Sequence, residues 1–100
     1  MSEVYVVVGH EFYASWVVRA FMQRSEAEGF ASRLSARYEE LRVPTAADRV
    51  DLDGTDTAPE WVQSNADQRA LRQIVEEGLD PEAGGLEVTW HCVAVPLGAP

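Results

Sequence analysis

Lysine is absent from this chain of 100 residues, and cysteine occurs once, as Cys92. A single cysteine excludes a disulfide within the chain and is typical of proteins from a reducing compartment. Without lysine, the protein has no Schiff-base nucleophile and no phosphate-binding lysine. The pair Gly84-Gly85 precedes a strand-like segment rather than a helix, so it predicts no phosphate-binding loop.

Long apolar stretches are also missing. No run approaches the ~20 residues that span a bilayer, so no membrane segment is expected. The start Met1-Ser2-Glu3 carries no positive charge ahead of an apolar stretch, which argues against a signal peptide. We therefore expect a cytoplasmic protein, folded as a single domain over residues 1–100.

Positive charge is scarce. The chain has 17 acidic and eight basic side chains, the latter all arginine, for a net charge of −9. Residues 1–38 carry four acids and four arginines, whereas residues 39–100 carry thirteen acids and four arginines and so hold the whole excess. Nucleic acids and anionic membranes are bound mainly through Lys and Arg, so we expect this chain to bind neither directly.

The residues that are present predict three strands and two main helices. Residues 4–8 are β-branched or aromatic and are apolar on both faces, which indicates a central strand. Ser25 and Glu28 form a capping-box pattern that opens a helix ending before Pro44. Its apolar stripe consists of Ala27, Phe30, Ala31, Leu34, Tyr38 and Leu41. The other segments are a strand over residues 16–22, a loop over 44–57, a helical turn over 59–64, a helix over 65–77 and a strand over 86–95.

The order β-β-α-α-β predicts an α+β fold, a small three-stranded mixed sheet with two helices on one face. We expect the first strand in the middle and the third strand parallel to it, because the chain reverses at each connection. The other face of the sheet is expected to be apolar, with Tyr5, Val7, Val17, Phe21, Val93 and Val95. Either the acidic loop at residues 44–57 covers this face or a partner does, and an open face would favour a homodimer.

Residues with catalytic or metal-binding chemistry are few. His10 begins a segment like a zinc-protease motif, but Ala14 occupies the place of the second histidine. His91 and Cys92 are adjacent in a strand and point to opposite faces, so they cannot share a metal. Cys92 is expected to be buried, and its pairing with His10 as nucleophile and base is the enzymatic alternative. We expect no cofactor, no metal and no enzyme activity.

The spacing of the aspartates in residues 51–56 resembles that of a calcium-binding loop. Glycine comes fourth rather than sixth, and Val62 stands where the pattern needs glutamate. We therefore expect a solvated acidic loop, with a weak cation site as the alternative.

Exposed carboxylates are the remaining candidates for a functional site. The predicted partner-binding residues are Asp48, Asp51, Asp53, Asp56, Glu60, Trp61, Glu76 and Glu77. Carboxylates displayed together could occupy the basic surface of a nucleic-acid-binding protein through the same Coulomb attraction that holds nucleic acid. Trp61 would be an aromatic anchor, unless it packs in the core. The alternative role of the charges is solubility alone.

The opening Val4-Tyr5-Val6-Val7-Val8-Gly9, the second strand and Ser25-Glu26-Ala27-Glu28-Gly29-Phe30-Ala31 resemble small phage and prophage proteins over residues 3–41. Some acidic proteins of this size from mobile elements, anti-CRISPR proteins among them, inhibit host defence. The resemblance implies an inhibitor in the cytoplasm of a bacterial host and assigns no residue roles.

Two functions are compatible with these observations. The first is a small acidic protein-binding module, a phage-type inhibitor that occupies a basic nucleic-acid-binding surface of a host protein complex. The alternative is a self-associating accessory or structural protein that dimerises through the apolar sheet face. Salt-sensitive association would indicate the first, and a salt-resistant dimer would indicate the second.

Overall fold

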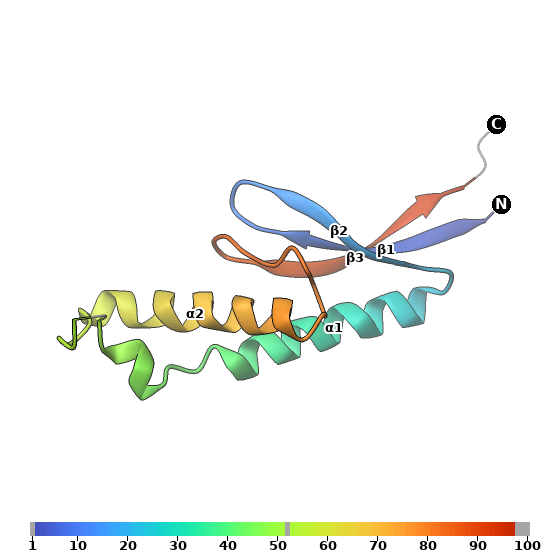
Figure 1. The fold of residues 1–100 in the computed structure, drawn as a ribbon. Helices are drawn as coiled ribbons and strands as arrows, with labels where there is room; N and C mark the ends of the chain where they lie inside the picture. The colour runs from blue at the N-terminus through green and yellow to red at the C-terminus, as the bar shows by residue number, and fades with distance from the viewer. Residues whose placement is uncertain (1, 52, 98–100) are drawn as a thin grey trace.

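The structure, a computed structural model, describes residues 2–51 and 53–97. Its elements are β1 (Glu3–His10), β2 (Ser15–Phe21), α1 (Arg24–Leu41), the 3₁₀ turn η1 (Ala46–Arg49), α2 (Pro59–Glu76) and β3 (Thr89–Pro96). The sheet has the order β2-β1-β3, and both helices lie on the same side of it (Figure 1). The expected α+β class, the order β-β-α-α-β and the central first strand are confirmed.

The expected mixed sheet is wrong, because β1 pairs antiparallel with both β2 and β3. The reason lies in residues 77–88, which connect α2 to β3. This segment runs back toward the β1–β2 hairpin before β3 begins, and so adds a reversal that the count of elements missed (Figure 1). The backbone N–H of Phe12 donates to the carbonyl of Leu86 at 3.0 Å and fixes this return to the hairpin.

The β1–β2 pairing contains a bulge, at which Val18 of β2 is the extra residue. An extra residue changes which side chains of a strand share a face. In a regular strand, Trp16 and Phe21 would lie on opposite faces, as alternation predicts. In the structure both pack toward the helices.

α1 begins ahead of its predicted cap. Its N-cap is Gln23, whose side chain makes no capping hydrogen bond, so the capping box expected at Ser25 is wrong. The apolar stripe is confirmed by the buried residues Ala27, Phe30, Ala31, Leu34 and Tyr38. Periodicity located the buried side of this helix better than it located the start.

α2 is one continuous helix, so the expected break between a helical turn and a second helix is wrong. Pro59 occupies the first turn, where its missing N–H costs nothing. The side chain of Asn65 does not cap a new helix; it donates to the carbonyl of Asp48 in η1 at 3.1 Å. Gly78 follows the helix with a φ of +74°, a conformation that glycine adopts without strain, and ends it.

The core forms where α1 packs on the sheet and α2 packs on α1. Val7 of β1, Leu34 of α1 and Ile74 of α2 are fully buried in it. The helices are also joined by an ion pair, in which Nε of Arg42 lies 2.8 Å from Oδ1 of Asp67.

A buried carboxylate, Asp80, connects the return segment to the sheet. Its Oδ2 accepts hydrogen bonds from the indole N–H groups of Trp16 at 2.9 Å and Trp90 at 2.8 Å. Its Oδ1 accepts from the backbone N–H of Glu82 at 3.0 Å. Asp80 has no exposed surface, so these three donors are what satisfies its carboxylate.

The molecule is elongated, with extents of 61 × 23 × 19 Å. Its radius of gyration is 16.5 Å, against ~13 Å for a compact domain of this length. The extra length comes from η1, the loop after it and the start of α2, which project beyond the sheet (Figure 1). We call residues 44–51 and 53–61 the acidic arm. It lies on the helical side of the molecule and does not cover the other face of the sheet.

Candidate interaction surfaces

Among residues 2–51 and 53–97, no helix or loop covers the face of the sheet turned away from α1, and we call it the open face (Figure 1). Strand pairing defines its members, because residues opposite one another in a sheet share a face. Its aliphatic members are Val4, Val6, Val8, Val17, Ala20, Val93 and Val95. The neighbouring side chains of β1, including the fully buried Val7, point to the helices instead.

The open face has the apolar composition of a sheet face that is covered by other elements. No charged side chain lies among its seven aliphatic positions, although 25% of the residues in the chain are charged. Val17 is 66% exposed, Val93 38% and Val95 39%. A sheet with one face in water normally carries polar residues on that face, whereas strands apolar on both faces are typical of sheets covered on both sides.

The predicted membership of this face was partly wrong. Tyr5, Val7 and Phe21 pack toward the helices, while the other three predicted residues lie on the open face. The central strand contributes Val4, Val6 and Val8 to the open face, in place of the predicted Tyr5 and Val7. Alternation within a strand says which residues share a face, but the register between strands decides which faces join.

Asp48 of the acidic arm is a structural residue. It is 4% exposed, and its Oδ2 accepts from Nη2 of Arg69 at 2.9 Å and from the backbone N–H of Thr45 at 2.7 Å. The hydrogen bonds from the Arg69 guanidinium and Thr45 lower the pKa of Asp48 from 3.8 to about 2. Asp48 therefore ties η1 to α2 and presents almost no surface to a partner.

Asp51 and Asp53 are exposed but hold the loop of the arm. Oδ1 of Asp51 accepts from the hydroxyl of Thr57 at 2.9 Å. Oδ1 of Asp53 accepts from the hydroxyl of Thr55 at 2.7 Å and from its N–H at 3.1 Å, and these bonds lower the pKa of Asp53. Within residues 2–51 and 53–97, no group of three or more His, Cys, Asp or Glu side chains could hold a metal ion. Leu52, in the calcium-like segment, lies outside the described residues.

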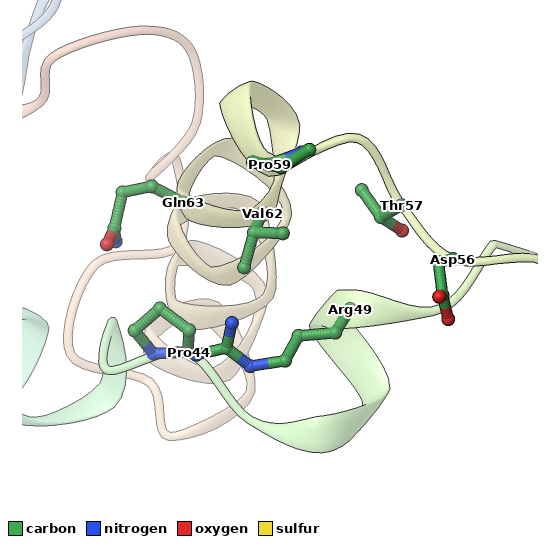
Figure 2. Close-up of a pocket in the computed structure, with 7 residues that line it drawn as sticks. All are labelled: Pro44, Arg49, Asp56, Thr57, Pro59, Val62 and Gln63. Carbon is green, nitrogen blue, oxygen red and sulfur yellow. The ribbon is translucent and has the colours of Figure 1, made fainter.

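Asp56, Glu60 and Trp61 are exposed at the end of the arm. Trp61 is 60% exposed, so its alternative placement in the core is wrong. A cavity of about 660 Å³ lies between η1 and the start of α2, and Figure 2 shows Arg49 reaching across it toward Pro44. Because its walls mix one arginine and one aspartate with apolar side chains, the cavity does not indicate one class of ligand.

Glu76 and Glu77 lie at the other end of α2 from the arm, ~25 Å away by the rise of the helix. Glu76 is exposed, whereas Glu77 accepts from Nε of Arg37 at 2.9 Å and from the side chain of Gln73 at 3.0 Å. Arg37 is the main cause that lowers the pKa of Glu77 to about 2. The eight predicted partner-binding residues thus do not form one surface.

The candidate catalytic pair does not come together. Cys92 lies opposite Val7 and packs against the core on the helical side. His10 lies on the other side of the sheet, where its Nδ1 is 2.7 Å from the hydroxyl of Ser15. His91 is exposed and lies opposite Val8. Nucleophile and base on opposite faces cannot exchange a proton directly.

Two exposed aromatic residues were missed as site candidates. Phe12 and Tyr13 at the tip of the β1–β2 hairpin are 65% and 80% exposed. The signal was present in the sequence, because hairpin turns are normally built from small and polar residues. Two adjacent aromatic residues in such a turn indicate that this surface has a role other than forming the turn.

Comparisons with known proteins add no relative. No protein-family model, no curated protein and no solved structure matches this chain. Within the part of the chain that the structure describes, neither helix is both long and apolar enough to cross a bilayer.

Proposed function

We propose that this protein is a non-catalytic interaction module that associates with a second copy of itself through the open face of the sheet. The observation that carries the proposal is the uncovered face of seven aliphatic side chains, formed by all three strands. Two such faces would pack ~10 Å apart as a β-sandwich, in which each copy supplies the second layer that the other lacks.

The size of the face supports a specific but modest interface. Strands of seven and eight residues, at ~3.3 Å per residue and ~4.8 Å between strands, give a face of roughly 350 Å². The largest exposed apolar patch on a typical monomer is ~300–600 Å² and often has a function, so this face is comparable in size to such patches. A two-fold dimer would match this patch with itself and bury roughly 700 Å² in total, which is the size of a weak, transient interface rather than a permanent one.

The distribution of charge favours a second copy as the occupant. Each chain carries a net charge of −9, so two chains repel unless their acids stay apart. The open face carries no carboxylate at its paired positions, and the acidic arm lies on the helical side of the molecule. Packing open face on open face therefore buries neutral surface and keeps the two arms away from the contact.

Sedimentation over a range of concentrations tests the proposal. We expect a concentration-dependent dimer that persists or strengthens between 50 mM and 500 mM salt, because salt screens the repulsion between acidic chains. Val17→Glu should weaken the dimer tenfold or more, since two charges would be placed in a neutral interface. Val17 is 66% exposed on an edge strand, so the fold should remain intact.

Val43→Glu is the matched control, because Val43 is 63% exposed just after α1 and lies outside the open face. It adds the same charge and should leave the dimer unchanged. A wild-type chain that stays monomeric up to about 1 mM would contradict the proposal, as would equal weakening by both variants.

A second candidate function is favoured by the exposed end of the acidic arm, where Asp56, Glu60 and Trp61 are all exposed. A projecting tip with carboxylates around an aromatic anchor suits the basic surface of a nucleic-acid-binding protein. This is the mode of action expected for a phage-type inhibitor in the bacterial cytoplasm. Asp48 and Glu77 are left out of this surface because they pair with Arg69 and Arg37.

The test of this second function is competition. The wild-type chain should displace nucleic acid from a captured bacterial protein at low salt, and a variant with Asp56→Asn and Glu60→Gln should do so at least tenfold less well. Glu3→Gln with Glu26→Gln removes the same charge elsewhere and should have little effect. If both double variants lost the ability to displace nucleic acid equally, net charge alone would explain the effect, and the proposed surface would be contradicted.

A further inference from the structure

The tip of the β1–β2 hairpin is an ordered aromatic surface. The rings of Phe12 and Tyr13 are 4.8 Å apart, with an angle of 73° between their planes. The turn is closed by the N–H of Glu11, which donates to the carbonyl of Ala14 at 2.8 Å. These aromatic side chains are exposed although they belong to a fixed turn, so their exposure is not explained by a loose end of the chain.

A buried carboxylate holds this tip against the return segment. Glu11 is 8% exposed, and its two oxygens accept from the backbone N–H of Tyr13 at 2.9 Å and of Leu86 at 3.2 Å. Gly85 makes room for the carboxylate, because a Cβ there would lie 2.5 Å from Oε2 of Glu11. The tip and residues 85–87 are therefore positioned relative to each other before any partner arrives.

Between the hairpin tip, the return segment and α2 lies a cleft of about 450 Å³. Its walls include Phe12, Tyr13, Tyr38, Asp67, Leu86 and Glu87. This volume is within the range of binding sites for small ligands and side chains. Among the residues that the structure describes, the charged ones that line the cleft are the carboxylates Asp67 and Glu87, without an arginine.

The two carboxylates of the cleft differ in availability. Oδ1 of Asp67 already pairs with Nε of Arg42 at 2.8 Å, and Arg42 itself does not line the cleft. Glu87 is exposed and forms no ion pair within the described chain. Its backbone has a φ of +54°, which is uncommon for a residue other than glycine. The cleft thus offers aromatic rings together with one free carboxylate.

We propose that this cleft binds an arginine side chain of a partner protein. A guanidinium stacks on aromatic rings, here Phe12 and Tyr13, and its paired N–H groups match a carboxylate, here Glu87. An ammonium group matches this lining less well, since it cannot stack as a plane or donate two parallel hydrogen bonds. The inference goes beyond the proposed self-association and does not depend on it, because the hairpin tip and α2 lie outside the open face.

Titration with a blocked Gly-Arg-Gly peptide, followed by backbone amide chemical shifts in NMR, tests the site. We expect saturable shifts at Tyr13, Leu86 and Gln68, around the cleft. The same peptide with citrulline in place of arginine keeps the shape and removes the charge. It should bind at least about fivefold more weakly, the loss expected for one exposed charge pair with its cation–π contact.

Variants separate the cleft from the general negative charge of the protein. Glu87→Gln and Tyr13→Ser should each weaken the arginine peptide several-fold, whereas Glu60→Gln, on the acidic arm, should not. Both substituted side chains of the cleft are exposed, so unchanged spectra elsewhere would show that the fold is retained. Equal binding of the citrulline peptide would overturn the proposal. So would shifts spread over the arm, or affinity unchanged in Glu87→Gln.

Discussion

The two faces of the sheet are built by the same strands and are both apolar, but the described part of the chain covers only one of them. On the helical face, the fully buried Val7 packs with Leu34 and Ile74, and Asp80 satisfies two indole N–H groups. On the open face, Val17 remains 66% exposed. We propose that the aliphatic side chains of the two faces have different uses, those of the helical face in folding a single chain and those of the open face in joining two chains. Substitutions on each face can test this division.

The largest effect is expected on the covered side, from Asp80→Ala. The substitution leaves the buried indole N–H of Trp90 and the partly buried indole N–H of Trp16 without their acceptor, and a buried unsatisfied donor costs about 1–3 kcal/mol. We expect a loss of about 3 kcal/mol or more in the free energy of unfolding, measured by urea denaturation. Glu82→Ala, in the same turn but with an exposed side chain, should change it by less than about 0.5 kcal/mol. Similar losses in both variants would show that Asp80 is not the link between the return segment and the sheet.

The second prediction compares valines on the two faces directly. Val7→Ala removes two methyl groups from a filled core and should cost about 2 kcal/mol. Val17→Ala should change the free energy of unfolding of the monomer by less than about 0.5 kcal/mol. Measurements at low protein concentration keep dimerisation out of the comparison. If Val17→Ala cost as much as Val7→Ala, the open face would be part of the core of a single chain.

A smaller effect is expected in the arm, where Asp48 joins η1 to α2. Asp48→Asn should cost about 1.5 kcal/mol at pH 7, since it replaces a hydrogen-bonded carboxylate beside Arg69 by a neutral amide. The pKa of Asp48 falls from 3.8 to about 2 on folding, so the carboxylate stabilises the folded state above about pH 4. This stabilisation is lost as pH falls through 2.

Denaturation of the wild type and of Asp48→Asn at pH 6, 3 and 2 measures this term. The difference between the two chains should shrink as the pH falls, while Asp56→Asn should differ little from the wild type at any pH. A difference independent of pH would mean that shape, rather than charge, makes Asp48 important.

The smallest effect on folding is expected at the hairpin tip. Phe12→Ser and Tyr13→Ser should change the free energy of unfolding by less than about 0.5 kcal/mol, because both side chains are largely exposed. Thermal and urea denaturation measure this. A loss above about 1 kcal/mol would show that the two rings serve the fold, in contrast to the valines of the open face, and would leave the cleft without its proposed use.

Local patterns in the sequence determined much of this protein. The β-branched run at residues 4–8 identified the central strand, and apolar spacings of three and four identified the buried side of α1. Pro59 lies in the first turn of α2 and Gly78 follows its end, and the backbone of each acts locally, proline by a restricted φ and glycine by a permissive one, although a break at residue 65 was wrongly expected between them. The order of elements and the α+β class follow from these signals.

Only the tertiary structure decided the direction of β3, the membership of the open face and the availability of each carboxylate. The return of residues 77–88 to the hairpin depends on contacts between segments far apart in the chain, and the bulge at Val18 depends on the pairing of β2 with β1. Asp48 and Asp56 look equivalent in an acidic stretch, yet only Asp48 meets Arg69, twenty-one residues along the chain. Charge and alternation can be taken from one segment of the sequence, whereas strand pairing and burial depend on two segments brought together. One segment alone therefore could not assign the pairing or the burial.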